Sequence, residues 1–232
     1  MWDRAVDGRI LNFHLLGVNN QNFLMTDEET GSWWQQITGE CILGPLKGKR
    51  LRRINSDEVS LAIWRGEHPA SSIVKFDPKY AAKYVNSEWE TRIGKIPTPP
   101  GMAAGPIGLR EQVVGIELDG VAVAYPLAAL RKRSPVSAQV GSTPVSFLVA
   151  ADGNSVRCFI RPRLNGQPLE FYRRAEDGTL VDGTTGSSWS FAGVATAGSL
   201  AGKTLEAVQT TKDYWFDWRV YHPSGVLRQR GI

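Results

Sequence analysis

The stretch DEETGSWW at residues 27–34 decides the fold, because a second version of it follows later in the chain. Residues 182–189 read DGTTGSSW, so an aspartate, a threonine, a glycine, a serine and a tryptophan recur at the same spacing. Self-similarity of this kind is typical of a structural unit that occurs more than once in a protein. The sequence therefore predicts two copies of one unit.

Three further blocks support this interpretation, because each recurs in the same order along the chain. The matched blocks are WRGEHP at 64–69 with WRVYHP at 218–223, GPLKGKRL at 44–51 with GSLAGKTL at 198–205, and DGRILNF at 7–13 with NGQPLEF at 165–171.

We predict a β-rich α+β protein with few short helices, made of two related halves that form an internal pseudo-repeat. The first repeat spans 1–76, a Pro/Gly-rich linker or crossover spans 77–110, and the second, fuller repeat spans 111–232. The first repeat lacks a counterpart of residues 111–160. Either it borrows strands from the second repeat, or the natural protein extends upstream of Met1.

Most of the second repeat reads as short strands. Residues 113–125 predict a hairpin that turns at Asp119-Gly120, since Asp-Gly is a preferred two-residue hairpin turn. Residues 145–149 and 156–160 predict two more strands. The short helical candidates are residues 126–131, which begin with proline, and residues 78–84.

Composition excludes several classes of protein. The net charge of +4 comes with short, scattered basic runs, which favours solvated loops over a nucleic-acid-binding face. No apolar run approaches the roughly 20 residues that a membrane-spanning helix needs. We therefore expect neither nucleic acid nor a membrane span, while the compartment and the oligomeric state stay open.

The repeated Asp-x-x-Thr-Gly-Ser segments favour tight turns. An aspartate there accepts hydrogen bonds from backbone N–H groups, while glycine adopts a positive φ. The alternative is a polar loop that carries Asp27 and Asp182 on the two halves and faces a shared groove. On that alternative, Asp182 is a candidate ligand-binding residue.

The eight tryptophans divide into matched and unmatched positions. The pairs Trp34/Trp189 and Trp64/Trp218 are predicted core residues, since a duplicated unit repeats its core. The unmatched Trp33, Trp89 and Trp215 are better candidates for exposure. Exposed tryptophan beside carboxylates and amides is typical of a sugar-binding face. The predicted ligand-binding residues are Trp33, Gln36, Asp182 and Trp215.

A catalytic hypothesis rests on Glu40 and Asp27. Glu40 has no acidic counterpart in the second repeat, and a residue that breaks the repeat is freer to serve function. If the protein is a glycosidase, Glu40 and Asp27 are the acid and base candidates, because that chemistry needs two carboxyl groups.

No metal or cofactor site is predicted. His68 and His222 each precede a proline at matched positions, and the three histidines lack zinc-binding spacing. We expect both to occupy equivalent turns without binding metal. Cys41 and Cys158 are far apart in sequence, which favours buried free thiols, with a disulfide left open. No phosphate-binding glycine loop or serine-nucleophile motif is present.

In this order, the blocks resemble the bacterial family DUF3179. The resemblance rests on Val114-Gly115, Ala124-Tyr125-Pro126-Leu127, Thr143-Pro144-Val145 and both copies of the later motifs. Many members carry Cys-x-x-Cys before the Asp-Gly-x-x-Leu-x-Phe segment, which implies thiol redox or metal chemistry. The second repeat of this chain has Cys158-Phe159-Ile160-Arg161 there, with one cysteine.

The leading functional hypothesis is a non-catalytic or accessory domain of the DUF3179 type, which binds a carbohydrate or another protein. The alternative is a hydrolase that acts on glycosidic bonds with groove carboxylates. A third hypothesis is a thiol-redox protein whose cysteine motif is missing from this chain. Whether the protein is an enzyme stays open at this point.

Overall fold

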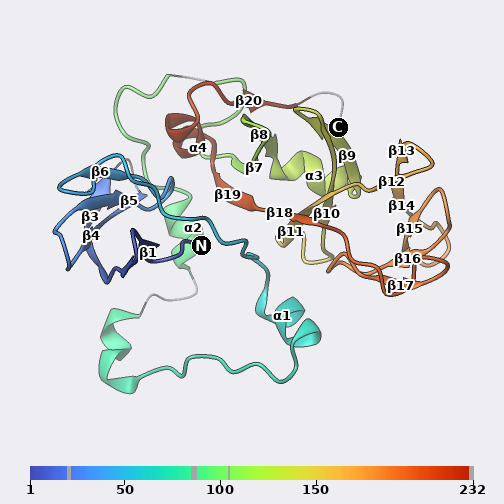
Figure 1. Cartoon of the computed structure of the whole chain (residues 1–232), viewed down its shortest axis with the longest axis horizontal. Helices are drawn as coiled ribbons and strands as arrows, with labels where there is room; N and C mark the ends of the chain where they lie inside the picture. The colour runs from blue at the N-terminus through green and yellow to red at the C-terminus, as the bar shows by residue number, and fades with distance from the viewer. Residues whose placement is uncertain (20–21, 85–87, 104, 230–232) are drawn as a thin grey trace.

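The computed structural model describes residues 1–19, 22–84, 88–103 and 105–229. It is β-rich, with several small sheets and few short helices (Figure 1). The strands of the N-terminal region lie on one side of the molecule, two sheets lie in the middle, and the strands around residue 180 lie on the opposite side. No helix among the described residues is both long and apolar enough to cross a membrane.

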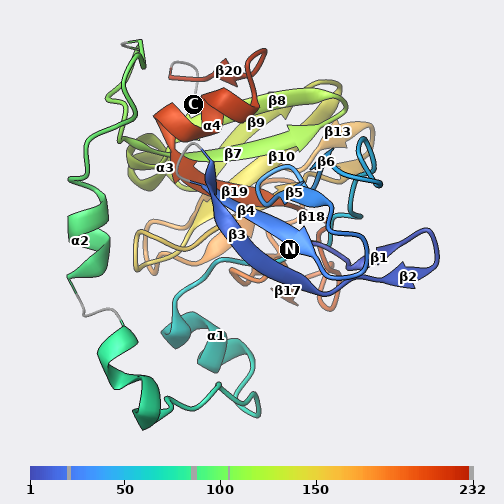
Figure 2. The same ribbon diagram turned by 90° about the vertical axis from the view of Figure 1, so that its left-hand side faces the viewer.

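Two four-stranded sheets and helix α3 (Leu127–Arg133) enclose the largest core cluster. The first sheet has the order β19-β7-β8-β20, with bounds Thr210–Tyr214, Gln112–Leu118, Val121–Pro126 and Val226–Leu227. The second has the order β18-β11-β10-β9, with bounds Ala207–Val208, Val156–Ile160, Thr143–Val149 and Val136–Val140. Figure 2 shows the two sheets as layers.

These elements confirm the local predictions. Strands β7 and β8 form an antiparallel hairpin, in which Asp119 and Gly120 both take a positive φ as the Asp-Gly turn requires. Strands β10 and β11 cover the two predicted strands, and α3 begins directly after Pro126. The predicted helix at 78–84 is the 3-10 helix η1 (Pro78–Lys83).

Two smaller antiparallel sheets flank the centre. The N-terminal one has the order β3-β4-β5-β6, with bounds Phe13–Asn19, Asn22–Asp27, Trp33–Gln35 and Cys41–Leu43. The C-terminal one has the order β14-β15-β16-β17, with bounds Phe171–Arg173, Leu180–Asp182, Ser188–Trp189 and Ala195–Ala197. Each follows a two-residue-strand hairpin, β1–β2 (Ala5–Val6, Arg9–Ile10) or β12–β13 (Arg163–Leu164, Gln167–Pro168).

The matched sequence blocks take the same local geometry in these two sheets. The indole Nε1 of Trp34 donates to Asp27 Oδ2 at 2.7 Å, and that of Trp189 donates to Asp182 Oδ2 at 3.0 Å. A phenylalanine packs edge-on against each indole, with ring centroids 5.8 and 5.6 Å apart. The aspartate therefore satisfies the polar edge of an otherwise apolar core side chain on both sides of the molecule.

The matched helices also end alike. Helix α1 (Leu61–Glu67) and helix α4 (Trp215–Tyr221) stop at His68 and His222, both with φ −129° and ψ 65°. Each imidazole lies against the tryptophan four residues earlier, with ring centroids 4.1 and 4.4 Å apart. The prediction that the two histidines occupy equivalent turns is confirmed.

The two helices differ in what covers them. Trp218 of α4 is 1% exposed and lies against Gly115 of β7, where a Cβ atom would fall 2.0 Å from its indole nitrogen. Trp64 of α1 is 39% exposed. The prediction that Trp64 is a core residue is therefore wrong: no residue of α1 is buried, whereas four residues of α4 are, with Trp218 packed against β7.

The segment predicted as a linker, 77–110, holds η1 and α2 (Trp89–Ile93), and its described residues include no strand. Figure 2 shows it running along one side of the molecule, away from the sheets. It rejoins the core where the carbonyls of Leu109 and Glu111 accept hydrogen bonds from the first residues of α4. Residues 77–110 therefore lead directly into the region where β19 ends and α4 begins.

Candidate functional site

Two aspartates lie where strand β19 passes into helix α4. Asp213 is the penultimate residue of β19, and its Oδ1 accepts a hydrogen bond of 2.7 Å from the backbone N–H of Tyr214. Asp217 lies in the first turn of α4, where its Oδ2 accepts a hydrogen bond from Asn22 of the N-terminal sheet. The strand-to-helix junction thus brings two carboxyl groups together beside Asn22 of the N-terminal sheet.

Each of these carboxyl groups keeps one buried oxygen without a hydrogen-bond partner among the described residues, Oδ2 of Asp213 and Oδ1 of Asp217. A buried carboxylate oxygen without a donor is costly, because the charge has lost its water. Asp217 is only 5% exposed. This environment therefore favours the protonated form of both groups.

The pKa values follow from this burial. Burial, followed by the negative charge of Asp217, raises the pKa of Asp213 to about 7. Burial also raises the pKa of Asp217 to about 6, against the opposing effects of the Asn22 hydrogen bond and the charge of Arg110. Such a pair can hold a proton near neutral pH, which an isolated surface aspartate cannot.

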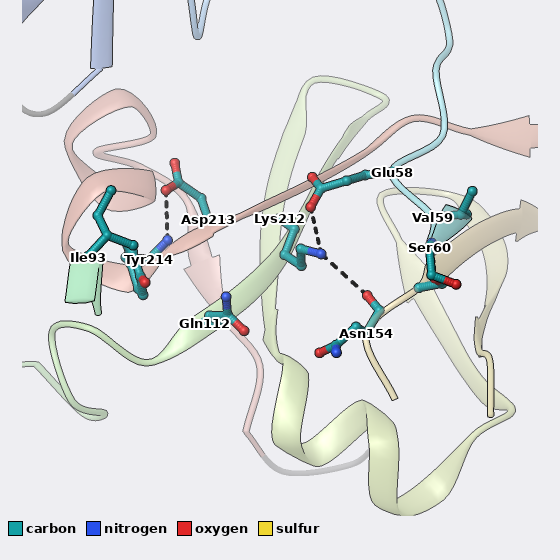
Figure 3. Close-up of a pocket in the computed structure, with 10 residues that line it drawn as sticks. Glu58, Val59, Ser60, Ile93, Gln112, Asn154, Lys212, Asp213 and Tyr214 are labelled. Carbon is teal, nitrogen blue, oxygen red and sulfur yellow. Dashed lines mark hydrogen bonds and ion pairs between the residues drawn. The ribbon is translucent and has the colours of Figure 1, made fainter. Parts of the chain in front are cut away.

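Asp213 lines two polar cavities. One, of about 490 Å³, is lined by side chains that include Glu58, Gln112 and Lys212. Figure 3 shows the Lys212 ammonium group between Glu58 and the carbonyl of Asn154, to which it donates at 2.6 and 3.4 Å.

The other cavity, of about 360 Å³, is lined by Trp2, Asn22, Gln36, Ser56 and Gln209, among others. We call the two cavities together the Asp213 cleft. Their volumes fall in or near the range of small-molecule sites.

The stability of the protein should report on this pair. A carboxyl whose folded pKa lies above its unfolded value of 3.8 contributes stability that is complete below that pH and lost as the pH rises through about 7. The Asp213→Asn variant has no carboxyl at this position, so it does not lose this stability as the pH rises. The free energy of unfolding of the variant, relative to the parent, should therefore increase from about pH 4 to about pH 8, as measured by urea denaturation. A difference that stays constant over this range would contradict the raised pKa.

The predicted catalytic residue Asp27 and the predicted ligand-binding residue Asp182 end strands β4 and β15, each directly before a turn. Both are fully buried, and each accepts hydrogen bonds from the backbone N–H and hydroxyl of a threonine three residues later. Burial opposes ionisation, but the hydrogen bonds from Trp34 and Thr30 outweigh it and lower the pKa of Asp27. Hydrogen bonds from Trp189 and Thr185 lower the pKa of Asp182 in the same way.

The other predicted site residues lie in different environments. Glu40 forms an ion pair of 3.1 Å with Arg50 at the surface. Gln36 lines the Asp213 cleft, and its backbone carbonyl accepts a 2.7 Å hydrogen bond from the indole of Trp2. Trp33 is 38% exposed. The expected exposure is confirmed for Trp33.

Trp215 corrects the second expectation for the unmatched tryptophans. It is 6% exposed, because it stacks on Trp218 at 5.8 Å and packs with Val113 and Ala124 of the central sheet. Trp89, by contrast, is 40% exposed, as expected. Trp215 is therefore buried although it has no matched tryptophan, because it lies in the buried first turn of α4.

The two cysteines are free and buried, in separate core clusters. Burial raises the pKa of both thiols. Neither should react with a thiol-specific reagent such as DTNB in the folded protein, because the attacking species is the thiolate. We expect two thiols to be released only after denaturation. Rapid reaction of either in the native protein would support the redox hypothesis instead.

The histidines take part in hydrogen bonds and ring contacts. Nδ1 of His222 lies 2.8 Å from the carbonyl of Trp218, and Nε2 lies 3.1 Å from Glu117. In the described part of the chain, no group of three or more His, Cys, Asp or Glu side chains is placed to hold a metal ion.

Sequence reasoning missed Asp213 and Asp217, although a signal for them was present. The block match at Trp64/Trp218 aligns these aspartates with Val59 and Ile63. Both therefore depart from the matched pattern by placing a carboxyl where the earlier segment has an aliphatic side chain. The argument that selected Glu40 applies with more force to them, since they are also buried.

Comparison with known proteins identifies a family and gives no function. Neither the curated proteins nor the solved structures include a match to this chain. A family described as a protein of unknown function, DUF3179, matches residues 1–225, which is nearly the whole sequence. The chain therefore belongs to the DUF3179 family.

Proposed function

We propose that this protein binds a small hydroxyl-bearing ligand of the carbohydrate type in the Asp213 cleft. The observation that carries the proposal is the buried Oδ2 of Asp213, which has no partner among the described residues, on a residue that lines two cavities. With a pKa of about 7, much of this carboxyl is protonated at neutral pH and can donate a hydrogen bond to a ligand oxygen.

The lining of the cleft supports a hydroxyl-bearing ligand. The side-chain amides of Asn22 and Gln36 carry both donors and acceptors, as sugar hydroxyls do, whereas that of Gln209 is bonded to Ser56 and Thr210. The indole of Trp2 adds an apolar surface that suits the C–H face of a sugar ring. This mixture of one aromatic ring with several amides matches a neutral polar ligand better than a purely apolar one.

We further propose that the cleft lies between two related halves, 1–76 and 111–232, with 77–110 as the connection. Two observations support this. Asp27 and Asp182 accept corresponding hydrogen bonds from Trp34 and Trp189, and the two helices end at His68 and His222 with the same backbone angles. Asn22 and Gln36 come from the first half, and Asp213 comes from the second. A ligand in the cleft would thus contact both halves.

Two substitutions of Asp213 test the binding proposal. Asparagine retains an acceptor for the Tyr214 N–H and replaces the carboxyl O–H with an N–H donor, so Asp213→Asn should bind like the parent. Leucine has neither group, so Asp213→Leu should lose at least tenfold in affinity. The measurement is a glycan-panel screen of the parent, followed by calorimetric titration with a ligand that binds. Asp177→Asn, in an exposed turn, is the matched control.

The pH dependence gives a second readout of the same proposal. Binding to the parent should weaken as the pH rises through about 7, because the donor proton is lost. Binding to Asp213→Asn should stay constant over that range. Equal affinities of parent and Asp213→Leu, or the absence of any glycan ligand, would contradict the proposal.

Hydrolysis of glycosidic bonds is the second candidate, because two neighbouring carboxyl groups have raised pKa values. A glycosidase needs one protonated and one ionised carboxyl group. Here Asp213→Asn should abolish turnover of a chromogenic glycoside while binding persists. The sequence-based assignment to Glu40 and Asp27 predicts instead that Glu40→Gln abolishes turnover. Absence of turnover by the parent would leave the binding function alone.

A further inference from the structure

A third cavity lies beside the Asp213 cleft and differs from it in charge. It has a volume of about 350 Å³ and lies where the N-terminal region meets β7 and α4. Arg50 and Arg53 contribute to it from the N-terminal side, and Glu117, Tyr221 and His222 from the other side. We call it the Arg50 cavity. Its volume suits a small molecule, not a protein segment.

His222 adds a third positive charge to this cavity. Its two ring nitrogens face two acceptors, the Trp218 carbonyl at 2.8 Å and the Glu117 carboxylate at 3.1 Å. Only the doubly protonated ring can donate to both. Burial opposes this charge, but the hydrogen bonds to Glu117 and Trp218 outweigh it and raise the pKa of His222.

The lining therefore has more positive than negative charge. Arg50, Arg53 and the doubly protonated His222 bring three positive charges, against the carboxylates of Glu40, which pairs with Arg50, and of Glu117, which lines the cavity. The Glu117 carboxylate is already engaged by His222 and, at 3.4 Å, by Arg53. A cavity with surplus positive charge attracts a small anion.

Hydrogen-bonding capacity also remains in the two guanidinium groups. In the described structure, Arg50 donates to Glu40 at 3.1 Å, and Arg53 donates to Glu117 and, at 2.8 Å, to Thr211. Each guanidinium group has five N–H donors in a planar fork, so these bonds use a minority of them. Planar forks of this kind bind carboxylate and phosphate oxygens in pairs.

We propose that the Arg50 cavity binds the anionic group of a small molecule, a carboxylate or a phosphate, through the guanidinium groups of Arg50 and Arg53, with His222 adding positive charge. Arg50 is the most accessible of the three, because its side chain is 61% exposed at the mouth. Arg53 and His222 lie deeper, with side chains 31% and 11% exposed. The site is distinct from Asp213 and stands whether or not a sugar binds there, although Trp2 and Arg53 line both regions.

The test is calorimetric titration of the full chain with inorganic phosphate and, separately, with malonate, at low ionic strength. The two titrations distinguish a phosphate from a carboxylate site. Arg50→Gln should weaken binding of the preferred anion at least tenfold, since the variant loses a charge that faces the ligand. Arg52→Gln is the matched control, because Arg52 is an exposed arginine that pairs with Asp3 and does not line the cavity.

Saturable binding of one anion that depends on Arg50 and not on Arg52 is the expected result. Equal weakening by the two substitutions would show that only the overall positive charge attracts the anion, which would overturn the proposal. Failure of both anions to bind would overturn it as well. Both variants alter exposed side chains, so a circular dichroism spectrum like that of the parent is expected for each.

Discussion

Replacing Asp182 with alanine should destabilise the protein by about 3 kcal/mol or more, because each buried donor left without an acceptor costs about 1–3 kcal/mol. The substitution strips the acceptor from the Trp189 indole and from the backbone N–H groups of Thr184 and Thr185. Asp27→Ala should have a similar effect, since it removes the acceptor of the Trp34 indole. Denaturant unfolding measures both losses.

Asp177→Ala is the control for this effect, because Asp177 lies in an exposed turn and accepts from Thr179 at 2.9 Å. We expect it to cost much less than Asp182→Ala. The lowered pKa of Asp182 adds a pH signature. Its stabilising contribution is complete above the unfolded pKa of 3.8 and is lost as the pH falls through the lower folded pKa. A loss below 1 kcal/mol for Asp182→Ala would show that the turn does not depend on this carboxylate.

Replacing Trp218 with alanine should cost about 3–5 kcal/mol, the usual range for truncating a buried tryptophan. Its ring is fully buried among Val113, Ala124 and Trp215 and stacks on His222. The matched variant is Trp64→Ala, in which a partly exposed ring at the corresponding position is removed. We expect it to cost less than half as much, because Trp64 is partly exposed on a helix that has no buried residue.

This pair of variants measures the difference between the two helices directly. Thermal and urea unfolding of both proteins provide the comparison. Equal losses for Trp64→Ala and Trp218→Ala would mean that α1 is covered in solution as completely as α4.

The repeated blocks predicted local structure well because each repeats a hydrogen-bonding unit. The Asp-x-x-Thr-Gly-Ser-x-Trp segment contains its own acceptor, turn and buried indole, so its geometry depends little on distant residues. The Asp119-Gly120 hairpin was predictable for the same reason. Local chemistry of this kind can be inferred from sequence alone.

Burial of the tryptophans could not be predicted as reliably, because burial depends on what packs over a residue. Trp64 and Trp218 are each followed by an arginine and, four residues on, by His-Pro, yet only Trp218 lies against β7. Trp215 is buried because the same sheet covers the first turn of α4. The contacts that decide these cases join segments about 100 residues apart, which periodicity and spacing do not reveal.

The residues of the candidate site could be predicted from the sequence only in part, for the same reason. Gln36 was selected from sequence and lines the Asp213 cleft, whereas Asp213 and Asp217 were not selected. Burial raises the pKa of both, and the charge of Asp217 further raises that of Asp213. Asn22, which bonds to Asp217, comes from a sheet nearly 200 residues earlier. Environment, more than residue type, therefore distinguishes these aspartates from the other acidic residues in the chain.

The central claim is that Asp213 holds a proton near neutral pH. It is tested most directly by following the side-chain carboxyl ¹³C resonances of the aspartates during a pH titration of the parent and of Asp213→Asn. We predict one aspartate resonance in the parent that titrates with a midpoint near 7 and is missing from the variant. A parent spectrum in which every aspartate titrates below about pH 5, the range of ordinary carboxyl groups, would contradict the claim.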